Sequence, residues 1–103
     1  MCGMAQDAGA LDVTLAAAAG EDRQLYEELR EAFRESVARQ VDLLSRSRCD
    51  GNWTVSAMRL KGLAASFHVD PLHELAERAL EAAPGEPTVV RALAQWLAEF
   101  SEV

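Results

Sequence analysis

The side chains of this chain that could take part in chemistry are few, and most of the informative ones lie between Ala57 and Phe67. In that segment Lys61 and Gly62 follow Met58 by three and four residues, which is about one helical turn. Lys61 at this spacing places a cation beside Met58. A glycine at this spacing lets the backbone of another protein approach closely. The pattern therefore indicates close docking beside a cation, with no catalytic residue.

Other reactive side chains are scattered. His68 directly follows Phe67 and is expected to mark a helix end, where the helix dipole favours a cation. His73 is expected in the first turn of the next helix, exposed to solvent. Cys2 and Cys49 are too few for a disulfide framework and are expected to be free thiols. No Cys/His cluster has the spacing of metal ligands, so we expect neither a metal nor a cofactor.

Capping and helix-stopping residues divide the chain into the elements that must position this segment. Residues 1–10 are small and polar and are expected to be disordered. Gly20 ends a short first helix and Asp22 caps a long second one. Asp70, as N-cap, and Pro71 restart a helix, and the Pro84–Pro87 stretch interrupts it. The expected helices run from about Leu11 to Ala19, Asp22 to Ser45, Trp53 to Phe67, Asp70 to Ala83, and from Pro87 onward, with a loop at Arg46–Asn52.

Apolar residues in the last four segments recur every three or four positions, which is the period of a helix with one buried face. The expected buried positions are Leu25, Leu29, Phe33, Val37, Val41 and Leu44; Leu72, Leu75, Ala76, Ala79 and Leu80; and Val89, Val90, Leu93, Trp96, Leu97 and Phe100. Short connections favour antiparallel neighbours. We therefore expect an all-α fold, an antiparallel up-down four-helix bundle with a short extra N-terminal helix. Residues 11–103 are expected to form a single domain.

At about 100° per residue, one side of the third long segment is open. We expect Leu60, Leu63, Ala64 and Phe67 to face the core. On the opposite side, the exposed residues form what we call the docking strip: Met58, Arg59, Lys61, Gly62 and Ala65. Because Gly62 has no side chain and Ala65 only a methyl group, a partner can approach the helix backbone closely along this strip. A mid-helix glycine costs roughly 0.5–1 kcal/mol relative to alanine.

The run Ala57-Met58-Arg59-Leu60-Lys61-Gly62 and the following Ala64 and Phe67 resemble the signature of histidine phosphotransfer (HPt) domains. That signature reads roughly Ala-His-x-Leu-Lys-Gly-x-Ala-x-x-Phe/Leu-Gly, and the His carries a phosphoryl group in two-component phosphorelays. Here Met58 occupies the position of the His, and a thioether cannot accept a phosphoryl group. His68 stands where the family usually has Gly.

The resemblance implies an HPt-like module that binds a receiver domain or a histidine kinase without relaying phosphate. It also implies that Lys61 steadies a phosphoryl group in active members. Three interpretations of Met58 remain open: drift after loss of activity, an apolar contact that improves docking, and an engineered substitution. We favour the docking contact, because Met adapts to irregular partner surfaces.

The charge distribution agrees with an acidic protein partner. The chain has a net charge of −7, which argues against nucleic acid or an anionic membrane as partner. Between Leu43 and Val69, however, four basic residues (Arg46, Arg48, Arg59 and Lys61) accompany one acid, a local net charge of +3. No run approaches the roughly 20 apolar residues of a membrane span, so a soluble cytoplasmic protein is expected.

Two alternatives remain. The first is an active phosphotransfer protein that uses His68 or His73. The second is a helical interaction module unrelated to phosphorelays. The oligomeric state stays open.

Overall fold

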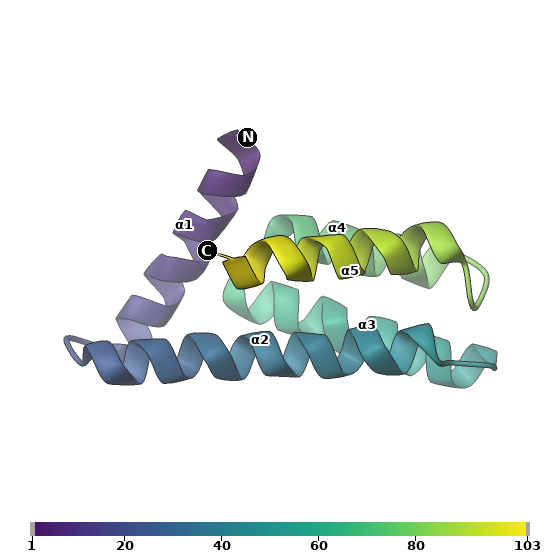
Figure 1. Ribbon diagram of the computed structural model, residues 1–103, viewed down its shortest axis with the longest axis horizontal. Helices are drawn as coiled ribbons and strands as arrows, with labels where there is room; N and C mark the ends of the chain where they lie inside the picture. Colours follow the sequence, from purple (N-terminus) through teal and green to yellow (C-terminus); the bar gives the residue numbers. More distant parts are fainter. Residues whose placement is uncertain (1, 103) are drawn as a thin grey trace.

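Five helices make up this protein in a computed structural model, which describes the backbone of residues 2–102 and the side chains of residues 11–100 (Figure 1). The helices are α1 (Cys2–Ala19), α2 (Arg23–Ser45), α3 (Asp50–Phe67), α4 (Asp70–Glu81) and α5 (Pro87–Glu102). No strand occurs between residues 2 and 102. The expected all-α class is therefore confirmed.

Most helix ends follow from the local chemistry that the sequence indicates. Gly20 adopts φ +68° directly after α1, a left-handed conformation that glycine takes without steric cost. The side chain of Asp22 accepts a hydrogen bond from the backbone N–H of Leu25 (3.0 Å) and so caps α2. Pro87 is the first residue of α5, a position where its missing N–H costs nothing.

Two helices begin earlier than expected. α1 starts at Cys2 and not near Leu11, because extending an existing helix adds a hydrogen bond for each residue that is fixed. The expected disorder of residues 1–10 stays a prediction. α3 starts at Asp50 and not at Trp53, so the expected loop at Arg46–Asn52 is too long. The extended backbone of Cys49 leads into the helix, and Asp50 in the first turn suits the helix dipole.

The expected cap of α4 is also wrong by one residue. Asp70 is the first residue of the helix, and Val69 is the N-cap, without a side-chain cap bond. The carbonyl of Val69 accepts the first hydrogen bond of α4, from the N–H of His73 (3.0 Å). Val69 is buried, so its packing into the core fixes where this helix can begin.

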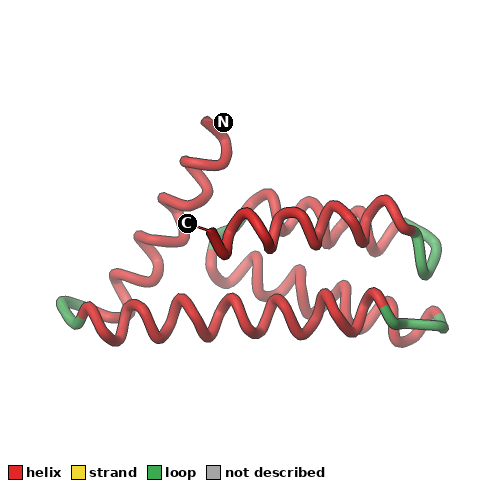
Figure 2. Tube along the Cα trace, in the orientation of Figure 1, coloured by secondary structure: helices red, strands yellow, loops and turns green. Residues whose placement is uncertain are grey.

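The helices pack in a closed order. α2 lies against α3 and α5, α3 against α4, and α4 against α5, while α1 packs on α2 and α3. In Figure 1 α1 crosses the end of the assembly where α2 begins, and α2 runs beneath α5. Short loops reverse the chain between successive helices from α2 to α5 (Figure 2). None of the helices within residues 2–102 is long and apolar enough to span a membrane.

One core joins all five helices. It includes Leu11 and Leu15 of α1, which therefore packs as part of the same unit. The expected inward positions of α4 and α5 are buried or partly buried, as are those of α2 with one exception. Leu25, in the first turn of α2, is exposed.

Aromatic residues set the rotation of α3 about its own axis. The buried indole N–H of Trp53 donates a hydrogen bond to the carbonyl of Ala79 in α4 (2.7 Å). At the other end of α3, the ring of Phe67 packs on Phe33 of α2, with 4.8 Å between ring centroids. With both ends fixed from inside, the opposite face of α3 is turned to solvent.

Candidate functional site

The docking strip is exposed along α3. Met58 is 57% exposed, whereas Leu60 and Ala64 on the opposite face are fully buried. Leu63 and Phe67 are partly buried and pack against the core, as the helical period predicts. Arg59, Gly62 and Ala65 are exposed, and Lys61 is partly so. The structure therefore brings the five predicted strip residues onto one accessible surface.

Gly62 is not required by the packing of this protein. Within the described chain, apart from its two chain neighbours and its own helix backbone, no atom lies within 4 Å of the place where a Cβ would stand. A side chain would therefore fit, and alanine would favour the helix by roughly 0.5–1 kcal/mol. The packing of the fold therefore does not require this glycine.

Lys61 is already paired within the protein. Its Nζ lies 3.6 Å from Oε2 of Glu77 on α4, and its side chain is 41% exposed. The Nδ1 atom of His73 lies 3.6 Å from the other oxygen of the same carboxylate. A cluster of Lys61, Glu77 and His73 therefore lies on the α4 side of the strip. The spacing of these residues along the sequence did not predict it.

His68 stands at the end of helix α3. It follows α3 with φ 60° and ψ 43°, the left-handed conformation usually taken by glycine. The N–H of Val69 then bonds back to the carbonyl of Ala64 (2.9 Å) and closes the helix end. The expectation that His68 marks the end of the helix is confirmed, although a β-carbon makes this conformation strained.

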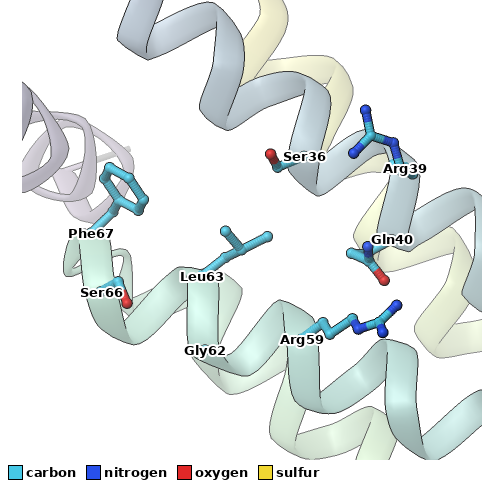
Figure 3. A pocket seen from close by; sticks show the side chains of 8 residues that line it. All are labelled: Ser36, Arg39, Gln40, Arg59, Gly62, Leu63, Ser66 and Phe67. Atoms are coloured by element: carbon cyan, nitrogen blue, oxygen red, sulfur yellow. The ribbon is translucent and has the colours of Figure 1, made fainter.

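The other flank of the strip borders a hollow between α2 and α3. Its volume is ≈ 410 Å³, and Figure 3 shows Gln40 of α2 facing Arg59 of α3 across it. Arg39 of α2 and Gly62 of α3 also line it. Leu63 and Phe67 form part of its lining. A second hollow of ≈ 440 Å³, lined among others by Leu43, Val55 and Arg59, lies toward the start of α3. Arg59 separates the two, and we call the pair the α2–α3 groove.

Sequence reasoning missed the contribution of α2 to this surface. Leu43 and Val55 are large apolar residues that are 37% and 47% exposed. Leu43 stands outside the predicted apolar stripe of α2, which is the signal that could have identified it. Arg39 and Gln40 gave no such signal, because polar residues are ordinary on the outer face of a helix.

The described residues offer no other obvious chemistry. Among the side chains of residues 11–100, no group of three His, Cys, Asp or Glu residues could hold a metal ion. Cys49 is exposed and free, and Cys2 lies outside the described side chains.

Comparison with known proteins gives no relative for this chain: no family model, no curated protein and no solved structure matches it.

Proposed function

We propose that this protein is an HPt-like docking module, in which α2–α5 form an up-down four-helix bundle that presents the docking strip to a partner. The partner is a receiver domain or a histidine kinase of two-component signalling. The module carries no phosphate at Met58, because a thioether has no nitrogen to be phosphorylated. It acts in the cytoplasm as an inhibitor, scaffold or adaptor rather than as an enzyme.

The observation that carries this proposal is the exposed glycine beside the exposed methionine. Gly62 makes α3 less stable and relieves no contact inside the protein. Met58 lies one turn away, with more than half of its side chain in solvent. An exposed apolar side chain next to backbone that no side chain covers suits another helix or loop that packs closely against α3.

The test compares the same substitution on two faces of the protein. Ala65 on the strip and Ala94 on α5 are both exposed alanines in helices, so each can be changed to arginine without disturbing the core. Binding of wild type and both variants to the receiver domains and kinases of the same cell is measured by calorimetry. We expect Ala65→Arg to abolish binding and Ala94→Arg to leave it unchanged. If wild type binds no receiver or kinase, the partner assignment is wrong.

A second candidate function has one structural observation in its favour. His73 lies beside the carboxylate of Glu77, whose other oxygen contacts Lys61. A carboxylate near Nδ1 favours the tautomer with a lone pair on Nε2. That lone pair would attack the phosphorus of an acyl phosphate as the P–O bond to the carboxylate leaving group breaks. Under this alternative, wild type takes up acid-labile label and His73→Gln does not.

The remaining alternative is a helical interaction module unrelated to phosphorelays. It predicts that Gly62→Arg, which blocks close approach to the strip, leaves the binding of its true partner intact.

A further inference from the structure

The α2–α3 groove contains two arginines without an internal counter-charge. Among the side chains of residues 11–100, neither Arg39 nor Arg59 has a carboxylate within ion-pair distance. Two neighbouring cations differ in this respect, because Lys61 is paired with Glu77 and Arg46 with Asp42 (2.8 Å). No carboxylate lines either hollow in the described part of the chain. In a protein of net charge −7, two unpaired guanidinium groups in one groove form a site for carboxylates of another molecule.

The edges of the same groove are apolar. Leu43, Val55 and Met58 are three of the five large apolar side chains that are exposed among residues 11–100. Leu43 and Val55 line the hollow toward the start of α3, and Met58 follows Val55 by three residues, on the same side of the helix. A partner that offered only charge would leave these side chains in water. The occupant must therefore offer an apolar face as well as carboxylates.

The side-chain amide of Gln40 is a polar group of the groove that lacks a hydrogen-bond donor among the described residues. Its Oε1 atom is buried, and it has no hydrogen-bond partner in the described structure. A buried acceptor without a donor costs free energy that an occupant can return. Figure 3 places the Gln40 side chain in the groove, opposite Arg59. Because this oxygen is closed to solvent, a donor of the occupant reaches it only when the amide turns outward.

The length of the groove suits a helix. From Val55 to Ser66 the α3 side of the groove spans 11 steps along a helix, or ~16 Å at ~1.5 Å per residue. That is about three turns of a partner helix. A shallow trough between two helices with charged and apolar walls is the setting in which one face of an amphipathic helix binds.

We propose that the α2–α3 groove binds an amphipathic helix of a partner protein whose carboxylates pair with Arg39 and Arg59 and whose apolar face covers Leu43, Val55 and Met58. This inference deepens the proposed function and rests on it, since it names the part of the partner that the docking strip receives. It assigns the charge recognition to the two arginines, not to Lys61.

The experiment uses two binding partners in parallel. The first is a synthetic helical peptide with leucines on one face flanked by glutamates, and its control carries lysines in place of the glutamates. The second is the panel of receiver domains and kinases. Each is titrated against wild type, the double variant Arg39→Glu/Arg59→Glu, and Arg91→Glu, an exposed arginine on α5 that serves as the control. Amide shifts of ¹⁵N-labelled protein report where the peptide binds and whether each variant is folded.

We expect the glutamate peptide to shift the amides of residues 39–43 and 55–66, and the lysine peptide to shift none. We expect the double variant to bind at least about tenfold more weakly, with a reduced dependence on salt, and Arg91→Glu to bind as wild type does. Shifts confined to other helices, or a folded double variant with unchanged affinity, would overturn the inference. If receivers bind the double variant normally, the proposed function stands without this inference. If the peptide binds in the groove but no receiver or kinase does, the helix site stands and the partner class is wrong.

Discussion

Restoring a histidine at position 58 tests whether the rest of a phosphotransfer site survives. Met58 is exposed, so Met58→His should cost less than about 0.5 kcal/mol of stability. The new Nε2 lone pair would attack the phosphorus of a receiver's aspartyl phosphate, and the P–O bond to the aspartate would break. We expect the variant to take up acid-labile phosphate, while wild type and the control Met58→Gln take up none at this position.

The strength of the ion pair between Lys61 and Glu77 limits how much a second substitution, Glu77→Gln, can change the rate of phosphoryl uptake. Glu77 holds Lys61 at 3.6 Å, and both side chains are substantially exposed, 41% and 49%. An ion pair of this kind is worth about 0.2–1 kcal/mol. Releasing the cation by Glu77→Gln should therefore speed phosphoryl uptake by Met58→His by up to about fivefold, since 1.36 kcal/mol corresponds to tenfold in rate.

The assay is single-turnover transfer of ³²P from receivers charged with acetyl phosphate, followed by acid and alkali treatment of the labelled protein. Thermal unfolding of each variant shows that it is folded. A folded Met58→His protein that takes no label from a receiver that it binds would refute the idea of an otherwise intact site. A Glu77→Gln change that slows transfer would refute the view that Glu77 competes for Lys61.

Four further outcomes are expected from the packing. Gly62→Ala should stabilise the fold by roughly 0.5–1 kcal/mol, because an added methyl group meets nothing. His68→Gly should stabilise it by about 1 kcal/mol, because φ is +60° there. Trp53→Phe should cost about 1–3 kcal/mol through loss of the buried hydrogen bond to α4. The wild-type protein should lose stability at alkaline pH, and Tyr26→Phe should abolish this loss. The hydrogen bond from Tyr26 to Asp12 on α1 raises the pKa of the phenol above its ordinary value near 10. The raised pKa stabilises the folded state fully below pH 10, and this contribution is lost as pH rises through the folded pKa.

Urea unfolding at constant m-value measures the first three, and a series from pH 8 to 12 measures the fourth. A destabilised Gly62→Ala would mean that the glycine is needed inside the fold, and this would remove the main support for docking. An unstable His68→Gly would show that the imidazole itself holds the end of α3. Wild type and Tyr26→Phe with the same alkaline profile would exclude the phenol as the titrating group.

Much of the architecture could be read from short-range signals. Gly20, Asp22 and Pro87 mark helix ends because their effect depends on their own backbone and the next few residues. The start of α3 could not be found in this way. Asp50 and Gly51 resemble loop residues, and the first turn forms there because the buried Trp53 is fixed against α4.

The exposed strip on α3 was predictable from the sequence, but its neighbours on the other helices were not. A period of 3.6 residues decides which side chains of one helix share a face, so the exposure of Met58 and the burial of Leu60 follow from the sequence alone. The pairing of Lys61 with Glu77, and the lining of one hollow by both Arg39 and Arg59, bring together residues that are 16 and 20 positions apart. They depend on how far two helices are shifted and rotated against each other.

By itself, then, the sequence determined the all-helical class, most helix ends and the solvent-facing side of α3, because these depend on neighbours within one or two turns. Only the tertiary structure decided that Lys61 is paired, that α2 contributes a wall to the groove, and that two arginines there have no counter-charge. Those facts depend on the relative offset of packed helices, which is set by core contacts such as Trp53 on α4 and Phe67 on Phe33.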